Sequence, residues 1–239
     1  MAPQARLVLD PAIHHESGAS KPSRARLHLP LQLNYWQDSW ALDRKRCPCD
    51  FHFLEYLTKR GVGSKSIFHF GSGEHHLLWR ANVVGPKRNE ILAITASKGE
   101  HAAYVELIIR KPEIAKYYKV LFGDIYTLST AMLPRFDFVS LFHLCEFYDS
   151  AKSAYARQDD ESLLELFLSK LKPGGRILFY RRSSAFAKAR SIIQDCLSSG
   201  RLVEEEDYRS LLICKAGPGP PAAGSNLVRP ARKAKLETL

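Results

Sequence analysis

Short apolar segments alternate with segments of helical periodicity along most of this chain, and this alternation limits the fold more than any other feature. Residues 66–70 and 136–142 are apolar runs of strand length, whereas residues 98–110 and 159–171 repeat apolar positions at helical spacing. Strands that are apolar along their whole length are typical of a parallel sheet covered on both faces. Because crossovers between parallel strands are right-handed, we predict a doubly wound α/β domain.

The complete set of predicted elements continues this pattern. Strands are predicted at residues 66–70, 90–95, 119–122, 136–142 and 176–180, and helices at residues 74–84, 98–110, 159–171 and 185–197. Two closing strands, at residues 202–206 and 210–214, are joined by a tight turn around Asp207 and Tyr208. So short a connection cannot join parallel neighbours, so one of the two strands must run antiparallel. The prediction is a mostly parallel seven-stranded sheet with a C-terminal antiparallel hairpin.

The two ends of the chain lack any such periodicity. Residues 1–33 mix proline, serine, histidine and arginine, and residues 216–239 combine Gly-Pro-Gly-Pro-Pro with basic residues. We predict a flexible N-terminal arm, a single domain over residues 34–215, and a disordered basic tail. The net charge of +10 has two interpretations. Either the basic residues serve solubility in disordered ends of the chain, or they attract an acidic partner such as nucleic acid. No nucleic-acid-binding motif supports the second interpretation, so nucleic acid is a possible partner but not the favoured one.

Composition also limits where the protein resides. No run of roughly 18 apolar residues is present, so no membrane partner is expected. The first residues lack the basic and apolar segments of a secretory signal. The five cysteines are irregularly spaced and do not form a disulfide framework. These features favour a cytoplasmic protein, and they leave its oligomeric state open.

A glycine-containing turn follows the first predicted strand. The segment Phe70-Gly71-Ser72-Gly73 ends that strand and precedes a helix. Two glycines allow a sharp turn and a close approach of the backbone to a ligand. The amides at the start of the following helix favour an anionic group. In an open α/β sheet, ligands bind beyond the carboxyl ends of the strands, so the turn is a candidate ligand site.

Four segments resemble, in order, motifs of the class I S-adenosylmethionine-dependent methyltransferases. Residues 66–73 resemble the glycine-rich first motif, and residues 119–125 resemble the third-strand motif. Residues 136–146 are similar to the fourth strand and the turn after it, and residues 171–178 to the entry into the fifth strand. The resemblance covers about residues 50–215. It implies a Rossmann-like methyltransferase fold with S-adenosylmethionine as the cofactor.

The resemblance also implies roles for particular residues. The first turn would hold the amino-acid portion of the cofactor, the third-strand motif the adenine, and the fourth-strand turn the methyl group, while an N-terminal segment would close over the site. The cofactor-binding residues implied in this way are Tyr35, Trp36, Phe70, Gly71, Ser72, Gly73, Thr95, Asp124, Ile125 and Phe142. The candidate catalytic residue is His143, as a general base.

Three positions depart from the family pattern. His69 replaces an acidic residue two positions before the first glycine, and His75 replaces the third glycine. Thr95 ends the second strand, where the family has a carboxylate for the ribose hydroxyls. Glu100, about one helical turn later, is an alternative source of that carboxylate. These departures bear on cofactor affinity more than on the fold.

The sequence therefore predicts methyl transfer to an oxygen or nitrogen nucleophile of a small-molecule acceptor. The alternatives are a non-catalytic methyltransferase-like binding or scaffold domain, and a nucleic-acid methyltransferase. No metal site is predicted. The histidines lack a carboxylate at ligand spacing, and Cys47-Pro48-Cys49 lacks the second cysteine pair of a strong zinc motif.

Overall fold

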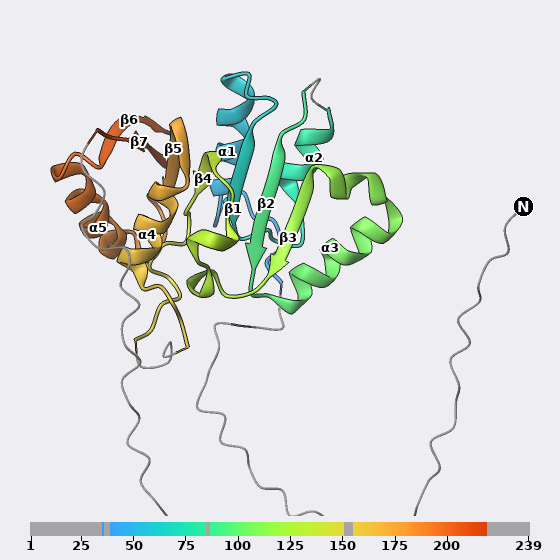
Figure 1. Cartoon of the computed structure of the whole chain (residues 1–239). Coiled ribbons are helices and arrows are strands. Elements are labelled where there is room, and N and C mark those ends of the chain that lie inside the picture. Colours follow the sequence, from blue (N-terminus) through green and yellow to red (C-terminus); the bar gives the residue numbers. More distant parts are fainter. Residues whose placement is uncertain (1–34, 36–38, 85–86, 151–154, 219–239) are drawn as a thin grey trace, which may run out of the picture. The chain divides into compact units, whose positions relative to one another are not determined.

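The computed structural model describes residues 35, 39–84, 87–150 and 155–218, and within them the predicted alternation of elements is confirmed (Figure 1). The helices are α1 (Cys49–Lys59), α2 (Leu77–Val84), α3 (Lys98–Arg110), α4 (Asp160–Ser169) and α5 (Phe186–Ser198). The strands are β1 (Ser66–Phe70), β2 (Glu90–Thr95), β3 (Tyr118–Phe122), β4 (Phe136–Ser140), β5 (Leu171–Tyr180), β6 (Leu202–Tyr208) and β7 (Leu211–Ala216). Short 3₁₀ helices η1 (Pro112–Lys116), η2 (Ile125–Thr127) and η3 (Thr130–Met132) lie beside β3 and before β4.

The seven strands form one sheet in the order β3-β2-β1-β4-β5-β7-β6. The pairs from β3 across to β5 are parallel, whereas β7 is antiparallel to both β5 and β6. This arrangement confirms the predicted doubly wound fold and identifies β7 as the reversed strand. The chain leaves β1 toward β2 on one side and later returns to β4 on the other. The edge beyond β1 and β4 is therefore the switch point at which α/β folds bind ligands.

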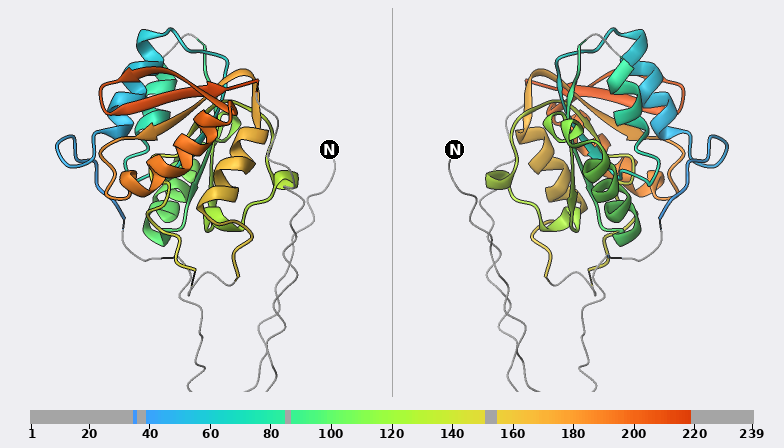
Figure 2. Two further views of the ribbon diagram at one scale, coloured as in Figure 1. Left: turned by 90° about the vertical axis from the view of Figure 1, so that its left-hand side faces the viewer. Right: turned by 90° about the vertical axis from the view of Figure 1, so that its right-hand side faces the viewer.

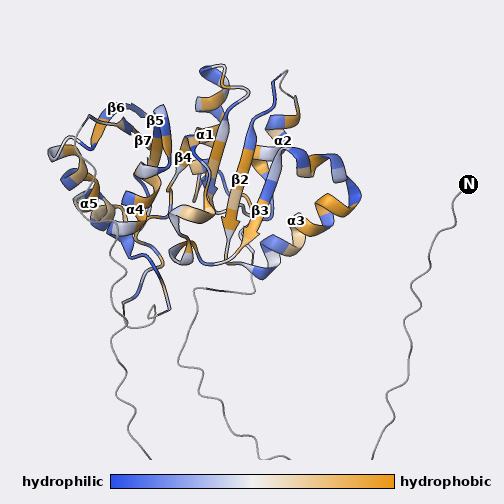
Figure 3. Cartoon of the chain, viewed as in Figure 1, coloured by the Kyte–Doolittle hydropathy of each residue, from blue (hydrophilic) through white to orange (hydrophobic). Residues whose placement is uncertain are grey.

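Helices cover both faces of the sheet, and each face has its own hydrophobic core (Figure 2). Helices α4 and α5 pack on one face, which includes Phe68 and Phe179. Helices α1, α2 and α3 pack on the other face, which includes Ile67 and Leu178. Neighbouring residues of one strand therefore point into opposite cores. Hydrophobic residues are concentrated in β2, whereas α3 alternates between hydrophobic and hydrophilic residues, as a helix with one face on a sheet should (Figure 3).

Side-chain caps fix the start of two helices. Ser97 precedes α3, and its hydroxyl accepts a hydrogen bond from the Glu100 amide at 3.2 Å. Asp159 precedes α4, where its carboxylate accepts from the Ser162 amide at 2.8 Å and the Ser162 hydroxyl accepts from the Asp159 amide at 2.9 Å. This reciprocal pair is a capping box, which satisfies amides that the helix itself leaves unpaired. The cap on α3 is also what places Glu100 at the end of β2.

Several element boundaries differ from the predictions by one or two residues, as at β4, which ends at Ser140 rather than at residue 142, and three differences have a visible cause. Helix α2 begins at Leu77 rather than at residue 74, because His76 has a positive φ of 46° that a helix cannot continue. Strand β5 runs through residues 172–175, which were predicted to precede it, because an irregularity in its pairing with β4 accommodates them. The closing turn lies at Arg209, with φ 55°, rather than at Asp207 and Tyr208.

Helix α1 was not among the predicted elements. Its first residue, Cys49, and its aromatic residues Phe53 and Tyr56 are buried in the core on the α1 side of the sheet. The last strand ends at Ala216, one residue beyond the predicted domain end. Predictions for residues 1–33, for Trp36 and for the tail from residue 219 fall outside the described residues. Within the described part of the chain, no helix has the length and apolar character needed to cross a membrane.

Candidate cofactor and active site

A cavity of about 530 Å³ opens at the carboxyl ends of β1 to β4, at the switch point of the sheet. Its floor comes from the loops that follow these strands, and its outer wall comes from the segment that leads into α1 and from the loop after β5. Ligand cavities in proteins are usually about 300–1,000 Å³. The cavity therefore has the location and the size of a cofactor site.

Most of the predicted site residues lie together in this cavity. Those that line it are Phe70, Gly71, Gly73, Thr95, Asp124, Ile125 and His143. Ser72 is buried in the same turn, with its hydroxyl 3.5 Å from a carboxylate oxygen of Glu100. The turn after β1 and the turn after β3 therefore meet at one edge of the sheet, although about fifty residues separate them in the chain.

Two predicted residues lie elsewhere. Phe142 does not line the cavity; it is buried in the core on the α1 side, where its ring meets Phe53 edge-on at 5.6 Å. The turn after β4 instead contributes His143, Glu146 and Phe147 to the lining of the cavity. Tyr35 lies beside the cavity, and its hydroxyl accepts a hydrogen bond from the Asp124 amide at 3.0 Å. Its ring also packs on Phe122, with centroids 5.3 Å apart.

The turn after β1 depends on its glycines. Gly71 and Gly73 have positive φ values of 88° and 56°, which other residues rarely adopt. A Cβ atom on Gly73 would lie 2.3 Å from Nε2 of His75, so the imidazole ring covers this glycine directly. His75, which replaces the third glycine of the family motif, therefore forms a side of the cavity.

Glu100 connects three segments around the cavity. Its carboxylate accepts hydrogen bonds from the Thr95 hydroxyl at 2.6 Å and from the Trp40 amide at 3.3 Å, and the Gly73 amide also donates to it. The residue is buried, with an exposed fraction of 3%, and burial raises the pKa of its carboxyl above the ordinary value despite these donors. The end of β2 thus has a carboxylate after all, supplied by the first turn of α3.

Asp124 is held rigidly at the end of β3. It precedes η2, and its carboxylate accepts hydrogen bonds from the Tyr126 amide at 3.1 Å and from the Tyr155 hydroxyl. Asp124 also lines the cavity. The network fixes the direction of the carboxylate and links the loop after β3 to the segment before α4.

Asp50 is a cavity residue that the sequence analysis did not select. It lies in the first turn of α1, and its two carboxylate oxygens lie 3.5 Å from Nε2 of His69 and 3.5 Å from Nε2 of His75. Burial raises the pKa of Asp50 to about 7 and lowers the pKa of His69 to about 3. His69 is therefore neutral at neutral pH, where Asp50 is near the midpoint of its titration. The two histidines that replace family residues thus converge on one carboxyl group.

His143 forms a dyad with Glu146 on the turn after β4. Its Nδ1 donates a hydrogen bond to Glu146 at 2.9 Å, and the Ser183 hydroxyl donates to the other carboxylate oxygen at 2.5 Å. Burial alone would lower the pKa of His143, but the hydrogen bond and charge of Glu146 outweigh it and raise that pKa. Nε2 of His143 faces Gly71, 3.6 Å from where a Cβ would lie. The carboxylate therefore orients the ring so that Nε2 faces the first glycine of the turn.

Replacing Glu146 with glutamine should lower the pKa of His143. Glutamine can still accept the hydrogen bond from Nδ1, but the largest of the charges that oppose burial is lost. An NMR titration of the imidazole protons would measure this change directly. Ser183→Ala is the matched control, because it keeps the Glu146 charge and should leave the pKa of His143 raised. If His143 titrated at the same pH in Glu146→Gln and in the unchanged protein, Glu146 would not be the cause of the raised pKa of His143.

Two arginines flank the outer part of the cavity. Arg46 precedes α1 and Arg182 follows β5, and both line the cavity. Neither guanidinium forms an ion pair with any residue that the structure describes. Guanidinium groups bind carboxylates and phosphates through paired hydrogen bonds. The side of the cavity away from the sheet is therefore suited to an anionic group.

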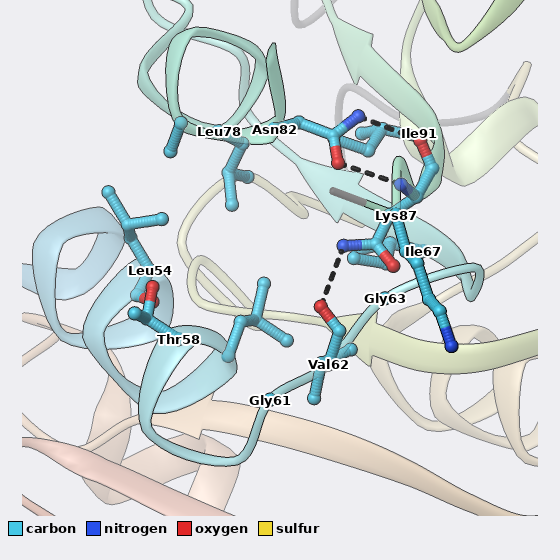
Figure 4. Close-up of a pocket in the computed structure, with 13 residues that line it drawn as sticks. Leu54, Thr58, Gly61, Val62, Gly63, Ile67, Leu78, Asn82, Lys87 and Ile91 are labelled. Carbon is cyan, nitrogen blue, oxygen red and sulfur yellow. Dashed lines mark hydrogen bonds between the residues drawn. The ribbon is translucent and has the colours of Figure 1, made fainter. Parts of the chain in front are cut away.

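A smaller cavity of about 260 Å³ lies at the opposite ends of the strands, between α1 and α2 (Figure 4). Its most conspicuous polar groups bond to one another. Asn82 and the backbone of Asn89 exchange two hydrogen bonds, of 2.8 and 2.7 Å, and the Asn89 amide donates to the Val62 carbonyl at 3.4 Å. This cavity is lined mainly by aliphatic residues and lacks the acids and histidines of the larger one.

Metal coordination has no support in the described residues, since no three of their His, Cys, Asp or Glu side chains form a group suited to an ion. His52, which follows the Cys47-Pro48-Cys49 segment, bonds to the Ser210 hydroxyl at 2.6 Å instead. The two thiols of that segment do approach each other, with their sulfur atoms 3.3 Å apart. Cys47 and Cys49 both line the larger cavity.

Comparison with solved structures places this fold among methyltransferases. A putative S-adenosylmethionine-dependent methyltransferase from Methanococcus maripaludis matches with a TM-score of 0.51 and 12% identity, covering 72% of this chain and 86% of that chain. The ribosomal protein L11 methylase from Lactobacillus delbrueckii subsp. bulgaricus matches with a TM-score of 0.50 and 14% identity, covering 75% of this chain and 81% of that one. The N-methyltransferase NodS from Bradyrhizobium japonicum WM9, solved with S-adenosyl-L-homocysteine, matches with a TM-score of 0.49 and 15% identity over 71% and 86%.

These likenesses show that the chain has the fold of the class I S-adenosylmethionine-dependent methyltransferases, as the sequence motifs predict. The identities are low enough that the comparison concerns the fold alone. No family model matches the sequence, and the comparison with curated proteins found no match.

Proposed function

We propose that this protein is an S-adenosylmethionine-dependent methyltransferase. The observation that carries the proposal is that Gly71, Gly73, Glu100, Asp124 and His143 line one cavity at the switch point of the sheet. The residues fit the cofactor in three respects. The nearest atom to a Cβ built on Gly71 would lie 3.5 Å away, so a ligand can approach the backbone there, a carboxylate lies at the end of β2, and a second carboxylate lies at the end of β3.

Each of these groups would hold one part of the cofactor. The turn at Gly71 and Gly73 would hold the amino-acid portion, Glu100 would accept hydrogen bonds from the ribose hydroxyls, and Asp124 and Ile125 would contact the adenine. When bound, S-adenosylmethionine supplies an electrophilic methyl group. Methyl transfer mainly requires alignment and exclusion of water. The segment before α1 would help to enclose the cavity, since residues 40–43 line it and the Trp40 amide donates to Glu100.

His143 would act as the general base for a protonated oxygen or nitrogen acceptor. A base must be neutral to accept a proton, and Glu146 raises the pKa of His143. Activity should therefore rise with pH as the imidazolium loses its proton. Glu146 would then stabilise the imidazolium formed when the acceptor proton is transferred, and would hold Nε2 toward the reacting groups.

The acceptor that fits this cavity is a small molecule with a carboxylate or phosphate group. Arg46 and Arg182 supply the positive charge, and both line the cavity together with His143. All five cysteines are free thiols, in keeping with a cytoplasmic location.

Acceptor screening tests the function. The full chain would be incubated with methyl-labelled S-adenosylmethionine and sets of small oxygen and nitrogen nucleophiles, in matched pairs with and without an acidic group. We expect label transfer and release of S-adenosyl-L-homocysteine with acidic acceptors, and much less with their neutral counterparts. Cofactor binding without transfer to any acceptor would favour the second candidate, a methyltransferase-like binding or scaffold domain. That candidate draws support from Thr95 at the ribose position and from His75 over Gly73.

A nucleic-acid acceptor remains a third possibility, which rests on the basic ends of the chain outside the described residues. Salt-sensitive retention of the protein on RNA or DNA would support it. Loss of that retention after removal of residues 216–239 would assign it to the tail.

A further inference from the structure

We propose that Cys47 and Cys49 form a redox-active dithiol at the rim of the cavity, which takes low-molecular-weight disulfides as its substrate class. In this site Cys47 attacks the disulfide, and Cys49 resolves the product as an intramolecular disulfide. The two sulfur atoms lie 3.3 Å apart, and only Pro48 separates the two residues in the chain. This activity is separate from methyl transfer and does not depend on the proposed function.

The local backbone holds the two thiols on the same side. Pro48 lies between them with φ −80° and ψ 6°, a turn conformation that brings its neighbours closer together than an extended strand would. Cys47 is anchored by its amide, which donates to the Asp43 carbonyl at 2.9 Å, and Cys49 is the first residue of α1. Neither thiol must travel far to meet the other, so little conformational entropy is lost on closing the bond.

The two thiols differ in exposure and ionisation, as an attacking and a resolving thiol should. Cys47 is partly exposed to the cavity, whereas Cys49 is 2% exposed. The hydrogen bond from the Cys49 thiol, together with the positive charge of His143, lowers the pKa of Cys47 to about 6 against the effect of burial. The same hydrogen bond and burial raise the pKa of Cys49. Cys47 is therefore largely thiolate at neutral pH.

The other cysteines of the described chain provide a contrast. Cys145, Cys196 and Cys214 are buried, and burial raises their pKa values to about 12, about 11 and about 12. Buried thiols of high pKa are unreactive toward disulfides. Reactivity should therefore be confined to the pair at the cavity.

The reaction balances with glutathione disulfide as the oxidant. The Cys47 thiolate attacks one sulfur of glutathione disulfide, the bond between the two glutathione sulfurs breaks, and one glutathione leaves as its thiolate. The Cys49 sulfur, on losing its proton, then attacks the Cys47 sulfur, and the second glutathione leaves. The protein gives up two electrons and the Cys49 proton, and with one further proton from the solvent glutathione disulfide is reduced to two glutathione molecules. Because the protein disulfide would close a very small ring, reducing thiols should reopen it readily.

Oxidation would change the rim of the candidate active site. The negative charge of the Cys47 thiolate contributes to raising the pKa of His143 and the pKa of Asp50. A disulfide removes that negative charge beside both groups. The dithiol is therefore placed where its redox state alters the electrostatics of the cavity.

The test uses the full chain with glutathione disulfide, followed by blocking of the remaining thiols and peptide mass analysis. We expect one intramolecular disulfide joining Cys47 and Cys49. Cys49→Ser should instead accumulate a stable mixed disulfide with glutathione on Cys47, and Cys47→Ser should form neither product. Cys196→Ser is the matched control and should behave like the unchanged protein. Iodoacetamide should alkylate Cys47 with a midpoint near pH 6, well below that of an ordinary cysteine.

Two results would overturn the proposal. One is a Cys49→Ser protein that accumulates no mixed disulfide under conditions that oxidise the unchanged protein. The other is alkylation of Cys47 with the pH midpoint of an ordinary cysteine, near about 8.5. Folding of each variant is checked by its circular dichroism spectrum, so that loss of structure is not mistaken for loss of reactivity.

Discussion

Asp50→Asn should make the folded protein more stable near pH 8, by up to about 4 kcal/mol, and should change little near pH 4. Burial raises the pKa of Asp50 from 3.8 in the unfolded chain to about 7 in the folded one. The folded state thus keeps a proton that the unfolded state has lost. The stability that comes from this proton is complete below pH 3.8 and is lost as the pH rises through about 7. Asparagine resembles the protonated carboxyl and cannot ionise.

Urea unfolding of both proteins at several pH values would measure the effect, which should grow as the pH rises. Asp43→Asn is the matched control. Asp43 is partly exposed, and hydrogen bonds from the Arg46 and Lys45 amides lower its pKa, so its replacement should not stabilise the protein at any pH. An Asp50→Asn protein that is less stable than the unchanged protein near pH 8 would mean that the ionised carboxylate is stabilising, held by protonated His69 or His75.

The cost of keeping Asp50 in the cavity has a functional implication. A carboxyl group whose pKa lies near neutrality, in a cavity and beside two histidines, has the properties of a functional group rather than of a structural ion pair. Such groups reduce stability where a binding site requires them. Asp50→Asn should therefore separate stability from function, raising the first while altering ligand binding.

Glu100→Gln should weaken the binding of S-adenosyl-L-homocysteine by about ten- to a hundred-fold while leaving the protein at least as stable. A hydrogen bond to a charged group contributes roughly 1.5–3 kcal/mol, and glutamine keeps the size of the side chain but not the charge. The Thr95 hydroxyl can still donate to the glutamine carbonyl. Stability should not fall, because burial opposes the ionised form of Glu100. Isothermal titration calorimetry and thermal unfolding would measure the two effects on the same samples.

Glu74→Gln provides the matched control for this change. Glu74 also lies after the glycine turn and bonds to the Ser39 hydroxyl, but it is exposed and outside the cavity. Its replacement should alter neither affinity nor stability measurably. Equal affinities for the Glu100→Gln protein and the unchanged protein would mean that Glu100 only holds Thr95 and Trp40, with no contact to the ribose.

The sequence was sufficient to predict the sheet because its strands are short, apolar and separated by helices of clear periodicity. It also identified the turn at Gly71, since closely spaced glycines between a strand and a helix are typical of a ligand-binding turn. It did not identify α1, although the buried residues Cys49, Phe53, Tyr56 and Leu57 recur at the spacing of an amphipathic helix. Boundaries such as the start of α2 depended on a positive φ at His76, which no local signal indicates.

The site residues that were missed share one physical cause. Asp50 and Cys47 reach the cavity only because α1 packs beside β1, a contact between elements that propensity alone does not specify. The sequence offered one usable signal for a site, which was the concentration of reactive side chains in Cys47-Pro48-Cys49-Asp50. It did not indicate that these side chains would meet His69, His75 and His143 in the folded protein. Phe142 and His143 were both selected, and the structure places His143 in the lining of the cavity and Phe142 in the core on the α1 side.

The central claim is that the cavity at the end of β1 to β4 binds an adenosyl cofactor. Calorimetric titration of the full chain with S-adenosyl-L-homocysteine tests it most directly. We predict saturable binding with a dissociation constant below about 1 mM, which corresponds to about 4 kcal/mol of binding free energy, accompanied by a rise in the unfolding temperature. The absence of both heat and thermal stabilisation at millimolar ligand would contradict the account.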